Sequence, residues 1–540
     1  MKRLLYIFES KYATAFCIIF AIANRIIFAT LYSTIGRDAR MQITYAKNFL
    51  AGKGLGVTKY FTANLNDPVF DTTQHFPPGF SFVIIPFIKL FKNDEYSAVL
   101  AFDIVTIFFF VFAARMLARA GGLPLAFRNI LTLIVGCSQY PFIMSGSSTD
   151  LVGLTIILFG ITFLIKITDP GGQLKPTTLF LYSLVFFLPS FFRYMYIPVS
   201  LLFPVIIILL GVYTGNKAVR SLGLRSGLYV LSLTFFLLFL SYKLSGNSVY
   251  VYDAGRGIFF NQLVHWYPYI PASFINLDFI AQLIARVAGI SYTNVFKIFE
   301  VLNTILLAFL SFLLLRYLLS LKRIQLNKSS VLILSGTAIC LCVLFVITYF
   351  SLTYKPQLYG IYLWNYNYES RYFAFIYIFL PVMLLLCVSV YSSLLKNIIF
   401  KGIIFTGLFL LFVEVIHGVY YNVKIVKREK DVMAIKDRVA DYKQFPEIVK
   451  ELTEKYPQHE LLITASDQVF LQSASQMGYK AIFDYTNLNT VSLKVSKKSL
   501  LLFPVHETDE WLMKEYLQKR KPRLLTKMAG TLFYIEEINP

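Results

Sequence analysis

Three charged residues at the edges of apolar segments have side chains that could do chemistry. Asp38 follows the first long apolar segment, and Arg193 and Arg371 each precede a tyrosine where an apolar segment begins or ends. A positioned carboxylate can act as the general base that turns a hydroxyl group into a nucleophile. A guanidinium group can bind a phosphate through two parallel hydrogen bonds. These residue types therefore suit proton abstraction and phosphate binding.

The same residues, and Asp150, also have structural interpretations that the sequence leaves open. Asp38 could simply pair with Arg37 or Arg40, and Arg193 and Arg371 could extend to lipid head groups. Asp150 stands at the start of an apolar segment, after Ser148 and Thr149. There it would either cap a helix and favour the helix dipole or face a polar site.

The composition indicates which elements must position these side chains. Of 540 residues, 57% are hydrophobic and 15% are charged, whereas soluble proteins carry about 45–50% apolar and about 25% charged residues. The net charge of +21 is distributed between apolar segments, which argues against a nucleic-acid-binding face. The five cysteines lack the paired spacing of a zinc site or a disulfide framework. We therefore expect a polytopic α-helical membrane protein.

Apolar segments long enough to cross a bilayer predict about eleven transmembrane helices. Lys and Arg collect in the loops that this count places in the cytoplasm, as the positive-inside rule requires. An odd number of crossings then places the C-terminal segment outside. We expect a membrane domain over residues 1–421 and an extracytoplasmic domain over residues 422–540. The predicted spans lie near residues 12–32, 96–117, 126–144, 151–168, 176–191, 194–213, 226–244, 294–318, 329–350, 371–394 and 402–421.

The first outer loop is predicted to hold helices that lie in the membrane interface. Residues 43–50 have the apolar spacing of an amphipathic helix. Residues 79–91 are apolar but short and begin after two prolines, which favours an interfacial or re-entrant helix. Counting them as a crossing would place the basic loop at 115–128 outside, against the positive-inside rule.

The C-terminal segment alternates short strand-like and helical patterns. Strands are predicted at 461–464, 480–483, 499–505 and 531–535, with helices at 423–456, 467–477 and 509–519. This alternation predicts a small α/β domain of about 100 residues.

The first outer loop also carries an ordered set of short motifs. Asp38 is followed by Tyr45-Ala46-Lys47-Asn48-Phe49-Leu50-Ala51-Gly52-Lys53-Gly54-Leu55 and then by Phe76-Pro77-Pro78-Gly79. This order, within residues 10–200, resembles the GT-C superfamily of membrane glycosyltransferases. It is most similar to the bacterial branch related to protein O-mannosyltransferases and lipid A aminoarabinose transferases. Ala39 stands where O-mannosyltransferases carry a second acidic residue, so Asp38 is the one carboxylate of this motif.

The resemblance implies a GT-C-like fold with its catalytic site on the outer side of the membrane. Asp38 would be the catalytic base, and Asp150 would be the second-loop acid that faces it. The donor phosphate would be bound by Arg193, Arg371 and Lys53. The residues expected to bind substrate are His75, Tyr45, Tyr194, Glu369 and Tyr372, although a single histidine before two prolines more often has a structural role in the turn. No metal ligand is assigned because a D-x-D arrangement is absent; no cofactor is required, and a divalent metal ion is left open.

The expected function is transfer of a sugar from a polyprenyl-phosphate carrier to a lipid, glycan or protein acceptor, with inversion, in a bacterial inner membrane. The only soluble domain that the sequence predicts is placed outside, where nucleotide sugars are scarce, and this placement favours a lipid-linked donor over a nucleotide sugar. The alternative is a transporter or flippase of polyprenyl-linked glycans, with Arg25, Asp103 and Glu414 as coupling groups. Such a transporter would be expected to show two related halves, and the sequence shows no duplication.

Overall fold

The structure, a computed structural model, folds into two compact units. It describes residues 6–31, 35, 37–62, 64–72, 76–92, 94–138, 149–168, 174–245, 278–291, 294–295, 298, 301, 305, 308, 327–353, 374–390, 398–427, 444–465, 468–482, 493–507, 514–528 and 530–540. We call the first unit, which comprises Met1–Thr30, Asp103–Leu238 and Val251–Lys424, the helical unit. We call the second, which comprises Leu31–Phe102, Phe239–Tyr250 and Ile425–Pro540, the sheet unit.

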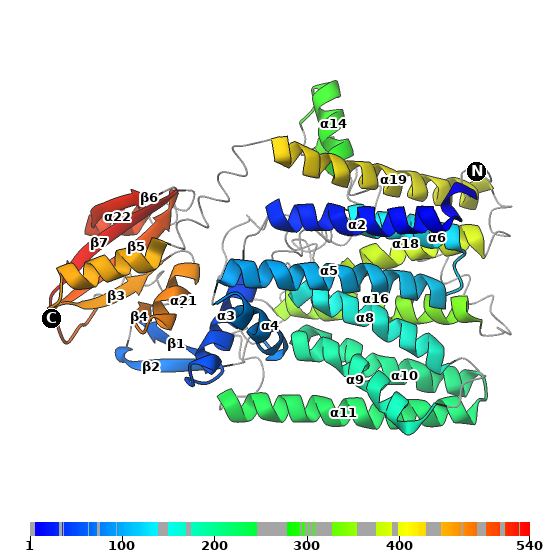
Figure 1. Cartoon of the computed structure of the whole chain (residues 1–540), viewed down its shortest axis with the longest axis horizontal. Helices are drawn as coiled ribbons and strands as arrows, with labels where there is room; N and C mark the ends of the chain where they lie inside the picture. The colour runs from blue at the N-terminus through cyan, green and yellow to red at the C-terminus, as the bar shows by residue number, and fades with distance from the viewer. Residues whose placement is uncertain are drawn as a thin grey trace. The chain divides into compact units, whose positions relative to one another are not determined.

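Long apolar helices form most of the helical unit (Figure 1). The described helices that contribute to it are α2 (Lys11–Leu31), α5 (Glu95–Ala120), α6 (Leu125–Cys137), α8 (Thr149–Ile167), α9 (Pro176–Phe192), α10 (Ile197–Tyr213), α11 (Lys217–Ser245), α14 (Asp278–Ala288), α16 (Lys328–Thr353), α18 (Ala374–Ser389) and α19 (Ile398–Lys427). Within the described residues, six helices are long and apolar enough to cross a membrane: α2, α5, α8, α10 with the turn before it, α11 and α16.

Four further predicted spans coincide with α6, α9, α18 and α19, which contain shorter apolar stretches. The remaining predicted span, residues 294–318, lies largely outside the described residues. The apolar helices show an integral membrane protein, and the count of eleven crossings stays a prediction.

Large apolar side chains cover much of the outer surface of these helices. Phe108 and Phe109 of α5 and Phe235 and Phe236 of α11 are each at least half exposed within the chain. A soluble monomer rarely leaves so many large apolar side chains in water. In a bilayer the lipid tails bury them, which agrees with the membrane prediction.

Small and hydroxyl-bearing residues let neighbouring helices approach closely. A Cβ atom added to Gly136 of α6 would overlap the Cβ of Ala21 in α2. The hydroxyl of Ser183 in α9 donates a hydrogen bond to that of Ser226 in α11, at 2.9 Å. Both devices are typical of helix packing in membranes, where apolar burial alone does not drive helices together.

The sheet unit is built around one seven-stranded sheet. Its strands are β1 (Gly56–Phe61), β2 (Asn64–Thr72), β3 (Glu460–Thr464), β4 (Lys480–Ile482), β5 (Ser499–His506), β6 (Arg523–Met528) and β7 (Thr531–Ile538). Their order is β2-β1-β4-β3-β5-β7-β6. The hairpin β1–β2 from the first loop therefore continues the C-terminal sheet, joined by a parallel pairing of Tyr60 with Ile482 (Figure 1).

Successive residues of the central strands point into two separate cores. Leu461 and Ile463 of β3 and Leu502 of β5 lie in the first core, with the helix at 444–455 and α21 (Gln468–Gln476). Leu462 and Leu501 lie in the second core, which also holds Leu65 of the hairpin and Tyr516 of α22 (Lys514–Arg520). This alternation is the period of two expected of strands buried on both faces.

The sheet predicted near the C-terminus is present. The four predicted strands correspond to β3, β4, β5 and β7, whereas β6 and the hairpin were not predicted. The predicted boundary at residue 421 between a membrane domain and an outer domain stays a prediction. The compact units group Leu31–Phe102 with Ile425–Pro540.

Candidate functional site

The motif of the first loop builds a helix with a defined end. Helix α3 spans Arg37–Leu50, and Gly52 follows it with a φ of 72°. The N–H of Lys53 bonds to the carbonyl of Asn48, and that of Gly52 to the carbonyl of Phe49. This pair of bonds is the Schellman motif, in which a glycine in the left-handed region ends a helix. The side-chain amide of Asn48 also donates to the carbonyl of Gly56 in β1, at 2.6 Å, so the motif fixes α3 against the hairpin.

Helix α4 (Gly79–Leu90) packs against α3 in the same unit. The hydroxyl of Ser81 donates to the carbonyl of Gln42, at 2.9 Å, and the rings of Phe49 and Phe82 meet edge to face. Its 12 residues cover about 18 Å at 1.5 Å per residue, less than the roughly 30 Å of a bilayer core. This length agrees with the prediction that residues 79–91 do not cross the membrane.

Asp38 lies in the first turn of α3, and its side chain lies outside the described part of the chain. Tyr45, two turns later, is fully buried in a small core with Met41, Leu55 and Val57. The backbone position of Asp38 is therefore set by a packed helix. Its assigned role as a base stays a prediction.

Two residues of α3 bind the carboxylate of Glu95, the first residue of α5. Arg40 forms a buried ion pair with Glu95, and Lys47 lies 2.5 Å from the other carboxylate oxygen. Arg40 also donates to the hydroxyl of Tyr96, at 3.0 Å. Asp94, beside Glu95, accepts hydrogen bonds from Tyr96 N–H and Ser97 within its own turn. The Glu95 carboxylate therefore binds two residues of α3 that lie two turns apart.

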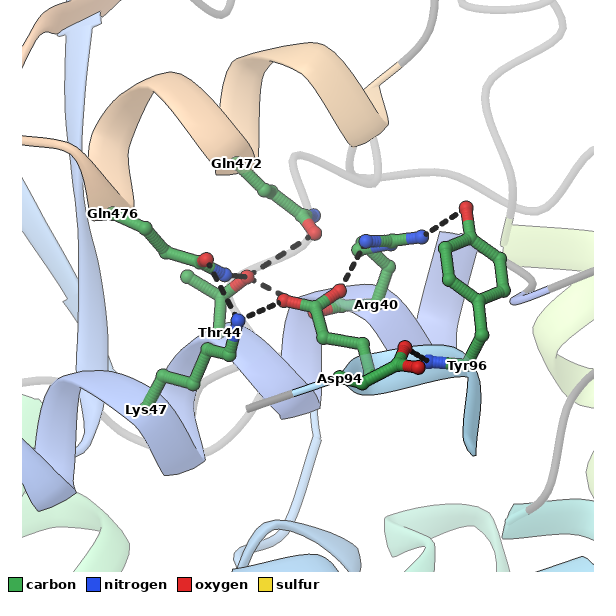
Figure 2. Close-up of polar contacts among 8 residues, drawn as sticks. Arg40, Thr44, Lys47, Asp94, Tyr96, Gln472 and Gln476 are labelled. Atoms are coloured by element: carbon green, nitrogen blue, oxygen red, sulfur yellow. Dashed lines mark hydrogen bonds and ion pairs between the residues drawn. The ribbon is translucent and has the colours of Figure 1, made fainter. Parts of the chain in front are cut away.

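The polar side chains on this face of α3 also meet α21 of the C-terminal segment (Figure 2). Thr44 donates to the side-chain oxygen of Gln472 at 3.4 Å and accepts from the amide of Gln476 at 3.0 Å. Lys47 lies 3.5 Å from the side-chain oxygen of Gln476. Residues of the first loop and of the C-terminal segment thus share one polar cluster.

In the helical unit, the structure brings together Asp150 and Arg193, two of the predicted site residues. Helices α8 and α9 are joined by a short connection and pack side by side, so the start of α8 lies near the end of α9. The Asp150 carboxylate is 2.6 Å from Nε of Arg193 and 3.0 Å from Nη2. The two residues are 2% and 6% exposed. Arg193 is thus packed within the protein and paired in a bidentate geometry, the strong form of this interaction.

A second residue of α8 supports this arrangement. Gly153, one turn after Asp150, faces the ring of Tyr196, and Tyr194 lies buried in the same short turn after Arg193. The N–H of Tyr196 bonds to the carbonyl of Arg193, at 3.0 Å. The packing of this turn on α8 therefore fixes the arginine opposite its carboxylate.

Other predicted site residues are exposed or lie outside the described residues. Lys53 is exposed at the glycine turn after α3. His75, Glu369, Arg371 and Tyr372 lie outside the described part of the chain. Within the described residues, no group of three or more His, Cys, Asp or Glu side chains could hold a metal ion.

Sequence reasoning missed Glu95 and gave Arg40 only a structural role beside Asp38. The signal for Glu95 is its place as an acidic residue at the first position of a long apolar helix. A carboxylate there is favoured by the helix dipole, so sequence alone offers no reason to assign it a partner elsewhere.

Comparison with solved structures finds a likeness to two crystal structures of ArnT from Cupriavidus metallidurans. The apo state is 13% identical, over 97% of this chain and 98% of that chain, with a TM-score of 0.45. The state bound to undecaprenyl phosphate is 12% identical over the same shares, with a TM-score of 0.44. No protein-family model matches the chain, and no curated protein matches it. Identity and TM-score are both low, so a functional proposal must rest on the residues of this chain.

Proposed function

We propose that this chain is a membrane glycosyltransferase of the GT-C kind that takes a sugar from a polyprenyl-phosphate donor. The acceptor is a hydroxyl group on a lipid, glycan or protein at the outer side of a bacterial inner membrane. The proposal starts from the ordered motifs of the first loop, which form the capped helix α3 with Asp38 in its first turn.

The observation that carries the proposal is the buried pair of Asp150 and Arg193. Both were singled out from the sequence, they lie 43 positions apart, and they meet at the ends of two apolar helices. Charged groups placed against a bilayer are expensive unless a pairing or a function offsets their desolvation. Asp150 holds the guanidinium plane of Arg193 in one orientation, as a group that receives a phosphate must be held.

In the proposed reaction, the acceptor hydroxyl oxygen attacks the anomeric carbon of the donor sugar. The bond between that carbon and the phosphate oxygen breaks, and its electron pair leaves with the phosphate. Asp38 accepts the hydroxyl proton as the new glycosidic bond forms. Direct attack predicts inversion at the anomeric carbon. Arg193 and Arg371 stabilise the charge that develops on the leaving phosphate.

The test is transfer by the purified full-length protein from a panel of undecaprenyl-phosphate sugars to a cell-envelope extract that contains lipids, glycans and proteins. We expect wild-type protein to transfer one of these sugars and Asp38→Asn to lose about 100-fold or more of the rate, as removal of a general base does. Asp94→Asn is the matched control, because asparagine replaces aspartate well at the start of a helix.

Three outcomes would contradict parts of the proposal. Unchanged transfer by Asp38→Asn would remove its role as the base. Retention of the anomeric configuration, determined by NMR of the product, would remove direct attack. Movement of a polyprenyl-linked glycan across vesicles, without any transfer, would replace the enzyme with a transporter.

A further inference from the structure

Three segments that are distant in sequence meet at the side chain of Glu95. Its carboxylate binds Arg40 and Lys47 of α3, and Lys47 also contacts Gln476 of α21. Glu95 itself begins α5, which continues into the helical unit. The first-loop helix, an apolar span and the C-terminal segment therefore converge on one carboxylate.

This cluster differs from a surface ion pair because the pair of Arg40 and Glu95 within it is buried. The side chains of Arg40 and Glu95 are 7% and 9% exposed, so their pairing is little screened by water. Two cations share the carboxylate, and Tyr96 lies against the guanidinium of Arg40, with its ring centre 5.3 Å away. Removing the negative charge would leave a buried cation without its counter-charge, and α3 would be pushed from its place.

The helix held in this way is the one that carries Asp38. Arg40 follows Asp38 by two residues, and Lys47 lies two turns further along α3. Contacts at both ends of a helix fix its axial position as well as its rotation. On the same face of α3, Thr44 and Lys47 bind α21 through Gln472 and Gln476 (Figure 2).

We propose that Glu95 is a positioning residue, which holds α3 in register with the C-terminal segment and so sets the place of Asp38. This inference rests on the proposed function for its kinetic consequence but not for its structural one. Movement of α21, for example when an acceptor binds the C-terminal segment, is transmitted to α3 through Gln476 and Lys47.

The experiment compares Glu95→Gln with the neighbouring Asp94→Asn in full-length protein. In Glu95→Gln we expect hydrogen exchange in residues 41–50 and 470–476 to become about tenfold faster, because local opening follows the loss of the contacts that hold both helices. We expect the transfer kcat to fall about tenfold or more with the donor KM changed less than about threefold, since misplacement of a reacting group affects the chemical step. Asp94→Asn should change neither measurement.

A second variant separates the contact between Glu95 and α3 from the contact between α3 and α21. It also keeps the inference testable if Glu95→Gln misfolds. Lys47 is partly exposed, so Lys47→Met should fold. It keeps the pair of Arg40 with Glu95 and cuts the charged contact to Gln476. We expect faster exchange in residues 470–476 and protection retained at residues 41–44 of α3.

Two results would overturn the inference. One is unchanged exchange of α3 and α21 in Glu95→Gln, which would remove the positioning role whatever the enzyme does. The other is a lower unfolding temperature in Glu95→Gln with an unchanged kcat per folded molecule, which would make the cluster merely stabilising. If the wild-type protein transfers none of the sugars tested, the proposed function fails, and the exchange measurements still decide the role of Glu95.

Discussion

Gly153 of α8 lies so close to the ring of Tyr196 that a Cβ atom on the glycine would be 2.5 Å from the ring carbon Cε2. Tyr196 belongs to the short turn that follows Arg193. The absence of a side chain at position 153 therefore lets this turn pack on α8, and Arg193 reaches Asp150 from there.

Gly153→Ala is expected to destabilise the helical unit by about 1–3 kcal/mol, as overpacking of a tight contact does. The ring of Tyr196 must move, and Arg193 moves with it, so transfer activity should fall as well. Thermal unfolding in detergent measures the stability. The control is Gly227→Ala in α11, where a Cβ atom would meet its nearest neighbour at an ordinary 3.6 Å. Equal stability of the two variants would contradict the prediction.

The pair of Asp150 and Arg193 should behave as a unit in a double-mutant cycle. Asp150→Asn removes the counter-charge of a buried guanidinium and should cost about 3–5 kcal/mol of the free energy of unfolding. Arg193→Gln should have a similar effect on the buried carboxylate. The double variant should cost clearly less than the sum of the two single variants. Additive losses would show that the two charges do not depend on each other.

Gly52 should be required for the end of α3. Its φ of 72° is accessible to glycine but strained for other residues, so Gly52→Ala should cost about 1 kcal/mol. Faster hydrogen exchange at residues 47–53 would report the loss of the cap. Gly402→Ala, at an exposed position in α19 with nothing within 4 Å of the new Cβ, should instead stabilise its helix by up to about 1 kcal/mol.

Tyr516 predicts a pH dependence for the sheet unit. Its hydroxyl donates to Glu536 at 2.7 Å, and burial, together with this bond, raises the pKa of the hydroxyl well above its ordinary value. A raised folded-state pKa contributes stability that is complete below the unfolded pKa of about 10 and is lost as the pH rises above it. Tyr516→Phe should therefore be less stable than wild type by about 1 kcal/mol near pH 8.

The difference between the two proteins should shrink above pH 10, because the phenylalanine variant has no hydroxyl to ionise when it unfolds. Hydrogen exchange of β5 and β7 in the full-length protein at several pH values measures the stability difference between wild type and Tyr516→Phe. A difference that stays constant across this range would contradict the assignment. Tyr456→Phe, which alters an exposed hydrogen bond with Arg523, is the control.

The parts of the fold that depend on local pattern were predictable from the sequence. Apolar runs predicted the helices because a bilayer requires internally bonded apolar segments. The predicted amphipathic stretch at 43–50 lies within α3 (Arg37–Leu50), which begins six residues earlier than the pattern indicated. The predicted strand at 499–505 lies within β5 (Ser499–His506), because apolar residues bounded by polar ones mark a buried strand.

The parts that depend on contacts between distant residues were not predictable. β2 is rich in polar residues, and the place of the hairpin in the sheet is set by the pairing of β1 with β4, more than four hundred residues later. Glu95 was missed for the same reason, since its partners come from another helix. Asp150 was identified, but the sequence left open whether it capped α8 or faced a polar site, and the structure pairs it with Arg193.

The single parallel pairing of Tyr60 with Ile482 also orders the biogenesis of the protein. A ribosome synthesises the β1–β2 hairpin early and β4 only after the last apolar helix, α19, has emerged. The edge of β1 that pairs with β4 must therefore stay unpaired while the remaining spans insert. A chain truncated after α19 would leave that edge of β1 without its partner strand.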